Sequence, residues 1–449
     1  MSKTPVSPLL TQVSAAYFGT NCGMNYVIRL SDGRFVIIDG NWGEYDEPEK
    51  FFAVLQEQNV LENGPVVAAW FFTHPHGDHF RGFQRLMARY GDQIKVEEIL
   101  FRFPKIGHPR FASMLDLFYD TIIGTHAKVI TPSTGDVYTY GDATFHVLFT
   151  CEDYGDTPVP NLNDNSLVMR MELAGHRVMW TGDIAQQGSA MLVEKYQNGE
   201  LACEIFQVPH HGYFGGSEDF CKAVDPEILL WPTPDYWYYT ARNWHTNAWL
   251  MTSEKVRATF IAGQNQFTLD LSKPIEAKSA YDKKVIDFDF TAKSVCDLRW
   301  GCPTGDAATE ELHAMSIEFP EEGVCRLTAD EGWNFCSMIQ KGQTATADRY
   351  SFQIDGLLKT EADYFGLKWN DPSPVGWSAE REDQLTRLNP TPGKPFSYRL
   401  TVDKASGFAV LLEDSKEIAR FEQLPEEPCD LLLVMRSGCV DLTRVLYES

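Results

Sequence analysis

Apolar residues occur in short continuous runs and at helical spacing along the first part of the chain. Residues 66–72 are apolar throughout, which is typical of a strand buried on both faces. Helical spacing of apolar positions follows from Phe80 to Tyr90 and also predicts a helix over 47–58. Further strands are expected at 26–30, 35–38, 97–101, 127–130, 145–149, 166–170, 177–180, 204–208, 227–231, 259–262 and 266–271, and further helices at 111–123, 183–196 and 245–253. Their alternation predicts a layered α/β architecture.

The pattern changes after a polar stretch at 273–284, which contains Pro274 and several lysines. Beyond it, apolar and polar residues alternate in short segments separated by Gly, Pro and Asp. The alternating segments are 286–290, 315–319, 396–402, 408–412 and 431–435. We therefore expect two domains, an α/β domain over residues 1–272 and an all-β sandwich over residues 285–449. The only histidine of the second domain is His313, and we identify no catalytic constellation there.

The strand at 66–72 ends in a dense cluster of metal-ligand side chains, His74, His76, Asp78 and His79. Imidazole nitrogens and carboxylate oxygens suit zinc and related divalent metals. His74 and His76 alternate, so on an extended segment both side chains leave the same side and can share one ion. Asp78 and His79 come where the helix begins and can serve a second position. The carboxyl end of a buried strand is also where open α/β sheets bind their ligands.

Two later strands end in further candidate ligands. Asp183 follows the strand 177–180 in Thr-Gly-Asp, where its carboxylate can bridge two metals, although Asp also suits a helix N-cap. His210 and His211 follow the strand 204–208 in His-His-Gly. Because adjacent residues of an extended segment point apart, we expect His210 to bind metal and His211 to face the substrate, with the reverse left open.

An aromatic segment over 236–244 precedes His245, which starts a predicted helix. His245 is a candidate substrate contact or last metal ligand, or else a helix-start histidine with no metal. Together with Tyr213, the aromatic segment could form a cage for a quaternary ammonium group such as that of choline phosphate. Ordinary aromatic packing is the alternative.

These motifs resemble the signature of the metallo-β-lactamase superfamily over roughly residues 10–270. The resemblance implies an αβ/βα sandwich with a binuclear metal site at the ends of its two sheets. It assigns one metal to His74, His76 and Asp183, and the other to Asp78, His79, Asp183 and His210. It also implies that Asp39, which closes the strand 35–38 before Gly40, orients ligand groups; a turn aspartate bonded to its own backbone is the alternative.

The block Asn165-Ser166-Leu167-Val168 resembles one branch of this superfamily. That branch includes the hydrolase domain of DNA-uptake competence proteins and bacterial choline-phosphate esterases. Lactamases and glyoxalases carry a further histidine in a Gly-His-Thr setting, where this chain offers Asn165; His146 and His176 stand in other contexts. This departure argues against a lactamase or glyoxalase, and it implies that the first metal has fewer protein ligands, more water ligands or a lower affinity.

We therefore expect a hydrolase that uses water activated by two divalent cations, zinc first, with manganese or iron also suited to these ligands. Its catalytic residues would be Asp78, together with His211 or His245 to polarise the substrate or protonate the leaving group. The net charge of −24 opposes nucleic acid but permits a small anionic substrate held by the metals, a phosphodiester above all. Carboxylic or thiol esters and nucleic acid stay alternative substrates.

Two readings from other classes also remain. A redox enzyme of flavodiiron type would need a Glu in the cluster and a flavin domain, and we find neither. A metal-stabilised binding protein would instead work through the sandwich, which could also form a homo-oligomer. The ten cysteines are scattered, without a Cys-x-x-Cys pair, and are interpreted as free thiols. Because the chain lacks a start of signal-peptide type and an apolar run of ~20 residues, we expect a soluble cytoplasmic protein without membrane contact.

Overall fold

The structure is a computed structural model that describes most of the chain. The described residues are 5–13, 23–43, 47–104, 109–155, 161–233, 245–262, 266–276, 285–291, 312–331, 333–339, 347–370, 385–422, 424 and 430–449. They belong to two compact units, the first up to residue 276 and the second from residue 285. None of the described helices is long and apolar enough to cross a membrane.

The first unit contains two mixed β-sheets. The first sheet has the order β15-β1-β2-β3-β4-β6-β7, with β5 paired to β4. Its strands are β1 (Leu9–Gln12), β2 (Asn25–Arg29), β3 (Phe35–Asp39), β4 (Val66–Phe72), β5 (Lys95–Val96), β6 (Glu98–Phe101), β7 (Lys128–Ile130) and β15 (Phe267–Asp270). Strands β3, β4, β6 and β7 are parallel, so their carboxyl ends meet along one edge of the sheet.

The second sheet has the order β14-β13-β12-β11-β10-β9-β8. Its strands are β8 (Val137–Tyr140), β9 (Ala143–Phe149), β10 (Val168–Leu173), β11 (His176–Trp180), β12 (Ile205–Gln207), β13 (Ile228–Trp231) and β14 (Ala258–Ile261). Strands β11 to β14 are parallel to one another. This sheet therefore also gathers several carboxyl strand ends at one edge.

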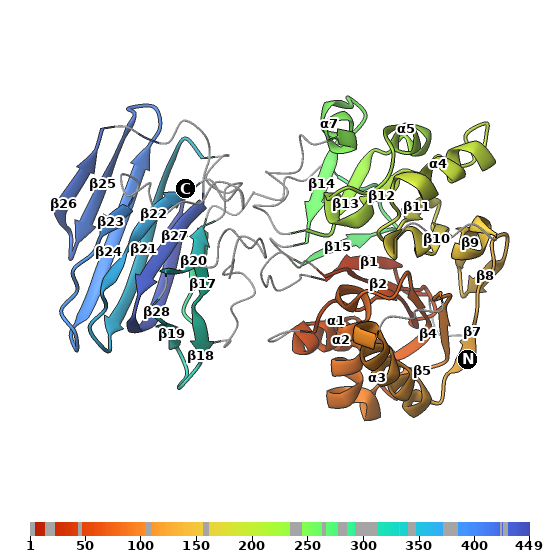
Figure 1. The fold of residues 1–449 in the computed structure, drawn as a ribbon, viewed down its shortest axis with the longest axis horizontal. Helices are drawn as coiled ribbons and strands as arrows, with labels where there is room; N and C mark the ends of the chain where they lie inside the picture. Colours follow the sequence, from red (N-terminus) through yellow and green to blue (C-terminus); the bar gives the residue numbers. More distant parts are fainter. Residues whose placement is uncertain are drawn as a thin grey trace. The chain divides into compact units, whose positions relative to one another are not determined.

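Helices cover the outer face of each sheet, as Figure 1 shows. The helices over the first sheet are α1 (Glu47–Gln58), α2 (Gly77–Tyr90) and α3 (Pro109–Thr125), and those over the second are α4 (Gln186–Lys195), α5 (Glu218–Val224) and α7 (His245–Thr252). Single 3-10 turns complete the unit: η1 (Gly91–Gln93), η2 (Cys151–Tyr154), η3 (Asn163–Asn165) and η4 (Pro209–Gly212). This arrangement is the expected αβ/βα sandwich, so the predicted fold class is confirmed.

Strand β4 explains why a continuous apolar run belongs in this fold. Phe71 packs in the core between the two sheets, beside residues such as Phe145 and Trp180 of the second sheet. Trp70 and Phe72, on the opposite face, pack under the helices. Both faces of the strand are buried, and apolar side chains are therefore favoured at every position.

The second unit is a β-sandwich, as expected. One sheet has the order β18-β19-β28-β21-β24-β25-β26 with β16 paired to β28, and the other has the order β17-β20-β27-β22-β23. The strands are β16 (Val285–Phe288), β17 (Leu312–Ala314), β18 (Ser316–Glu318), β19 (Cys325–Ala329), β20 (Trp333–Ile339), β21 (Arg349–Leu358), β22 (Tyr364–Asn370), β23 (Leu385–Arg387), β24 (Pro395–Asp403), β25 (Phe408–Glu413), β26 (Lys416–Phe421), β27 (Asp430–Arg436) and β28 (Gly438–Glu448). All described pairings are antiparallel except β17 with β20. Buried side chains of both sheets, such as Phe352 and Leu433, form the core.

Candidate metal centre

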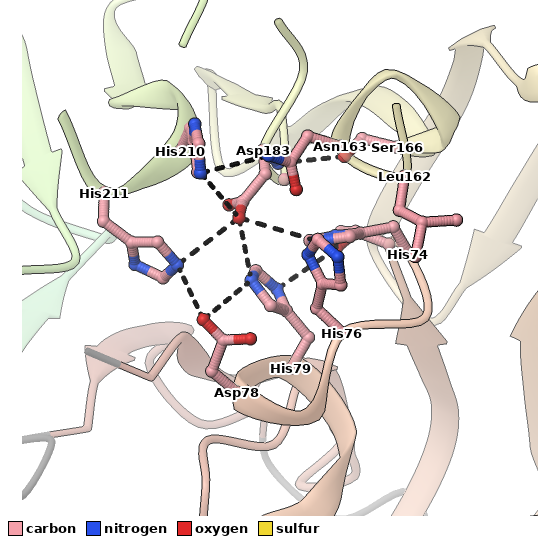
Figure 2. A network of polar contacts seen from close by, with 12 residues as sticks. His74, His76, Asp78, His79, Leu162, Asn163, Ser166, Asp183, His210 and His211 are labelled. Carbon is pink, nitrogen blue, oxygen red and sulfur yellow. Dashed lines mark hydrogen bonds and ion pairs between the residues drawn. The ribbon is translucent and has the colours of Figure 1, made fainter. Parts of the chain in front are cut away.

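Three chain segments meet at the carboxyl ends of strands from both sheets of the first unit (Figure 2). The turn from β4 to α2 supplies His74, His76, Asp78 and His79. The turn from β11 to α4 supplies Asp183, and η4, after β12, supplies His210 and His211. Residues more than 130 positions apart are thus brought together by strand ends, the places where α/β sheets bind ligands.

The carboxylate of Asp183 lies at the centre of this cluster. Its Oδ2 atom has four imidazole nitrogens around it, which are Nε2 of His79 at 3.3 Å, of His74 at 3.5 Å, of His211 at 3.5 Å and of His210 at 3.9 Å. Its backbone N–H donates to Ser166 Oγ at 2.9 Å, which fixes the start of the turn. The Asp183 side chain is only 2% exposed, so water contributes little to its solvation.

The donor atoms form two groups that could each hold a metal ion. The groups are His74, His76 and Asp183, and Asp78, His79, Asp183 and His211. Asp183 belongs to both groups, as a bridging carboxylate would. The buried Nε2 of His79 and Oδ1 of Asp183 have no hydrogen-bond partner in the structure. Because buried polar atoms are rarely left unsatisfied, these two atoms and the His/Asp donor set fit divalent cations.

The pKa of each ionisable side chain in the cluster depends on the charges of its neighbours. Burial opposes a charge on Asp183, but His79, His211 and His74 outweigh it and hold the pKa of the carboxyl well below its usual range. Burial also opposes a charge on His79, but the carboxylates of Asp183, Asp39 and Asp78 raise its pKa to about 10. Burial lowers the pKa of His74 well below its usual value. We therefore expect His79 to hold a proton whenever no cation is bound, and a bound cation to displace it.

Asp39 lies behind His79, on the side away from Asp183. Its Oδ2 accepts a hydrogen bond from His79 Nδ1 at 2.8 Å, which leaves Nε2 of the ring facing the cluster. Thr73 holds the carboxylate in turn, donating from its backbone N–H to Oδ1 and from its hydroxyl to Oδ2, each at 2.8 Å. Such a carboxylate–histidine pair fixes the tautomer and the orientation of a ligand ring.

Comparison with known proteins agrees with this geometry. Residues 23–233 match the model of the Metallo-beta-lactamase superfamily. The first unit contains a metallo-β-lactamase superfamily domain. The resemblance inferred from the sequence motifs is therefore confirmed.

The domain is also similar to individual proteins. ComE operon protein 3 of Bacillus subtilis is 25% identical over 164 residues, which cover 36% of this chain and 19% of that protein. This chain thus spans about a fifth of the length of that curated relative. Among solved structures, the metallo-beta-lactamase fold protein YhfI from Bacillus subtilis is 17% identical, with a TM-score of 0.33 over 50% of this chain and 85% of that one. CmlA, a diiron beta-hydroxylase from Streptomyces venezuelae, is 13% identical, with a TM-score of 0.32 over 51% and 45% of the two chains.

In the metallo-β-lactamase domain, the two adjacent histidines lie the other way round from our expectation. His211 joins the donor group, with Nε2 at 3.3 Å from Asp78 Oδ2, and its Nδ1 donates to the carbonyl oxygen of Pro232 at 2.7 Å. His210 belongs to neither donor group. The expectation assumed an extended segment, but β12 ends at Gln207 and both histidines have positive φ in the turn η4. Strand alternation therefore does not apply there.

The structure also turns Asn165 away from the donor groups. Its side-chain amide donates to the carbonyl oxygens of Asn161 and Leu162 within its own loop. Instead Asn163, two residues earlier, reaches the cluster and donates to His210 Nε2 at 3.1 Å. Asn163 was not among the site residues expected from the sequence, although it lies only two residues before the block that begins at Asn165.

The remaining candidates are only partly described. The ring of Tyr213 lies 5.7 Å from that of His210 and 6.4 Å from that of His211, measured between centroids. His245 starts α7, but its side chain and residues 236–244 lie outside the described part of the chain. The role of His245 and the aromatic cage therefore stay predictions.

Proposed function

We propose that the metallo-β-lactamase domain is a dimetal hydrolase of phosphoric esters, acting on small phosphodiesters. The observation that carries this proposal is the pair of donor groups that share the buried carboxylate of Asp183. A site for two adjacent cations suits a phosphodiester, because the metals offset substrate charge that a protein of net charge −24 would otherwise repel. Residues 285–449 would form an accessory domain.

The proposed ligand sets follow the two donor groups. His74, His76 and Asp183 would hold one ion, and Asp78, His79, Asp183 and His211 the other, with zinc the first choice. A bound metal pair supplies Lewis acidity toward the phosphoryl group and activation of a water molecule. The first group contains three described residues, which is compatible with the absence of a Gly-His-Thr histidine.

The chain's own residues orient these donors. Asp39 holds the Nδ1 proton of His79, and the Pro232 carbonyl holds that of His211, so both rings present Nε2 to the cluster. The side chain of Asp78 is 18% exposed, whereas Asp183 is buried below it. Asp78 thus lies at the solvent side of the cluster, where a substrate would enter.

The substrate class is tested with nitrophenyl esters on protein loaded with zinc or manganese. We expect hydrolysis of bis-nitrophenyl phosphate or nitrophenyl-phosphocholine, little hydrolysis of nitrophenyl acetate, and loss of activity in Asp183→Asn. Preference for the phosphocholine ester would favour a choline-binding group near the site. Metal-loaded protein that cleaves only the acetate, or none of the three esters, would contradict the proposed substrate class.

A further inference from the structure

Asn163 and His210 lie beside the shared carboxylate without belonging to either donor group. We propose that these two residues form a substrate-binding pair that hydrogen-bonds a phosphoryl oxygen of the substrate. This inference rests on the proposed function, because it assumes a phosphoric ester at the metal centre. The selection of the substrate would then depend on hydrogen bonds from Asn163 and His210 and not on the metals alone.

The side chain of His210 is more exposed to solvent than those of the neighbouring site residues. The side chains of His74, His79, Asp183 and His211 are 0–3% exposed, whereas that of His210 is 25% exposed. Its Nε2 nevertheless lies 3.9 Å from Asp183 Oδ2. His210 thus borders both the shared carboxylate and the solvent, as a residue in contact with a bound substrate would.

The pair has unused hydrogen-bonding capacity. Asn163 Nδ2 donates one hydrogen to His210 Nε2 at 3.1 Å, and a primary amide has a second one to donate. His210 Nδ1 is buried and has no hydrogen-bond partner in the structure; because Nε2 accepts from Asn163, Nδ1 carries the ring proton that a phosphoryl oxygen would accept. Buried donors are rarely left unsatisfied in folded proteins, and a bound substrate oxygen would supply the missing partner of this N–H group.

The backbone holds His210 in an unusual conformation. Its φ is +50°, a region that costs a non-glycine residue free energy and persists only where the surroundings impose it. Its backbone N–H donates to the Gly182 carbonyl oxygen at 3.2 Å, and its carbonyl oxygen accepts from the Tyr213 N–H at 2.7 Å. The bond to Gly182 connects His210 to the segment that carries Asp183, and the bond from Tyr213 closes the turn η4 itself.

Asn163 is held against the same segment from the other side. Its neighbour Asp164 is 1% exposed, and Asp164 Oδ1 accepts from the backbone N–H groups of Ala185 at 3.1 Å and Gly188 at 3.0 Å, at the start of α4. Ser166 Oγ accepts from the Asp183 N–H. Asn163 and His210 are therefore fixed relative to the shared carboxylate, which is the preorganisation that substrate recognition needs.

The chemistry of the pair points to a singly charged substrate. His210 Nε2 accepts from the Asn163 amide, so the ring has one N–H group to donate, and neither this group nor the amide supplies positive charge. Such donors suit the single negative charge of a phosphodiester, but they leave the second negative charge of a phosphomonoester without a counter-charge. The pair would therefore add to the preference of the site for diesters over monoesters.

The test measures binding of inorganic phosphate and of a non-hydrolysable phosphodiester by calorimetry to the zinc-loaded full chain, with metal content measured in parallel. We expect Asn163→Ala to keep its metal and to bind the diester roughly tenfold more weakly, the loss of a hydrogen bond to a charged group. Asn163→Asp should bind more weakly still, because its carboxylate repels the anion. Gln56→Ala removes an exposed amide of α1 and is the matched control.

A double variant tests the pairing itself. If the residues act together, Asn163→Ala/His210→Ala should bind the diester about as weakly as the weaker single variant. Unchanged affinity in Asn163→Ala, fully additive effects, or loss of metal from Asn163→Ala would overturn the inference. A wild type that binds the diester but hydrolyses no phosphoric ester would refute the proposed function, while the binding measurements would still decide on the pair.

Discussion

Asp183 combines near-complete burial with a negative charge. An isolated carboxylate in such a place would take up a proton, because desolvation of an ion is costly. Here the surrounding imidazoles keep the pKa of Asp183 low, and the protonated His79 supplies the counter-charge. A site that needs a proton to hold its donors together in the metal-free state is well matched to a divalent cation.

The two adjacent histidines should differ in their effect on metal content. His211→Ala removes a donor and should lose one metal ion per chain, whereas His210→Ala should keep both ions and lose mainly affinity for substrate. Metal analysis by mass spectrometry of both variants, purified alike, checks this. Equal metal loss in the two variants would contradict the distinct roles.

Metal affinity should rise with pH. The pKa of His79 is about 10 in the metal-free site, so between pH 6 and 9 the ring is protonated and binding must release that proton. The apparent zinc affinity should therefore increase by about tenfold per pH unit over this range, since one proton is displaced. Competition with a chelator at pH 6.5, 7.5 and 8.5 measures it; a flat profile would argue that His79 is neutral before the metal binds.

Residue spacing predicted side-chain directions correctly where the residues directly follow a strand. His74 and His76 lie two residues apart after a strand, and the structure brings their facing nitrogens, Nε2 and Nδ1, to 2.9 Å. For His210 and His211 it favoured His210 as the ligand and left the reverse open, whereas His211 lies in the donor group; the positive φ values of this turn are not visible in the sequence. Asn163 was missed because the 3-10 turn η3, which decides which asparagine faces the cluster, cannot be predicted from the sequence pattern.

At the scale of elements, α2 is positioned by close contact with the end of β3. A Cβ atom at Gly82 would lie 1.7 Å from the Gly40 carbonyl oxygen, and one at Gly40 would lie 2.9 Å from the Phe83 nitrogen. The Gly82 N–H donates to the Asn41 carbonyl oxygen at 2.8 Å. The absence of side chains thus lets the helix that carries Asp78 and His79 approach the strand that carries Asp39.

Gly82→Ala should destabilise the first unit by roughly 3 kcal/mol, because the added methyl group has no space and must displace α2. The same substitution at Gly124 of α3, where nothing lies within 4 Å of the added atom, should stabilise by up to about 1 kcal/mol through helix propensity. Urea unfolding of both variants measures the difference. Equal stability of the two would refute the close-contact argument.

Alternation of apolar and polar residues predicted some strands of the sandwich and missed others. The alternating segments at 396–402 and 408–412 correspond to β24 and β25. The strand β28, which pairs with β16, β19 and β21, was not singled out. Its buried positions shift from Val440 and Leu442 to Val445 and Tyr447, next to a register irregularity opposite Asp355 and Gly356. A β-bulge of this kind breaks the period-two pattern that the sequence would otherwise show.

For the whole molecule, the metal centre joins segments that are distant in the sequence. Both donor groups found among the described residues lie in the first unit, and together they connect the turns after β4, β11 and β12. An ion bound only by the folded state stabilises that state in proportion to its affinity. The second unit has an apolar core of its own, and neither donor group includes a described residue of that unit.

Removal of metal should therefore lower the thermal midpoint of the first unit alone. Saturation at about 1,000 times the dissociation constant contributes about 4 kcal/mol per site, so a chelator should shift that transition down by several degrees. Calorimetry of the full chain with and without chelator, and with zinc restored, checks this. A single transition that ignores the chelator would show that the cluster holds no stabilising ion.

Metal stoichiometry shows whether the first unit binds two ions that share Asp183. Wild-type protein and Asp183→Asn are each loaded with zinc, freed of excess metal and analysed by native mass spectrometry. We expect about two ions per wild-type chain and the loss of at least one from the variant, because the shared carboxylate belongs to both donor groups. Wild-type protein that retains no metal, or a variant that retains both ions, would contradict this expectation.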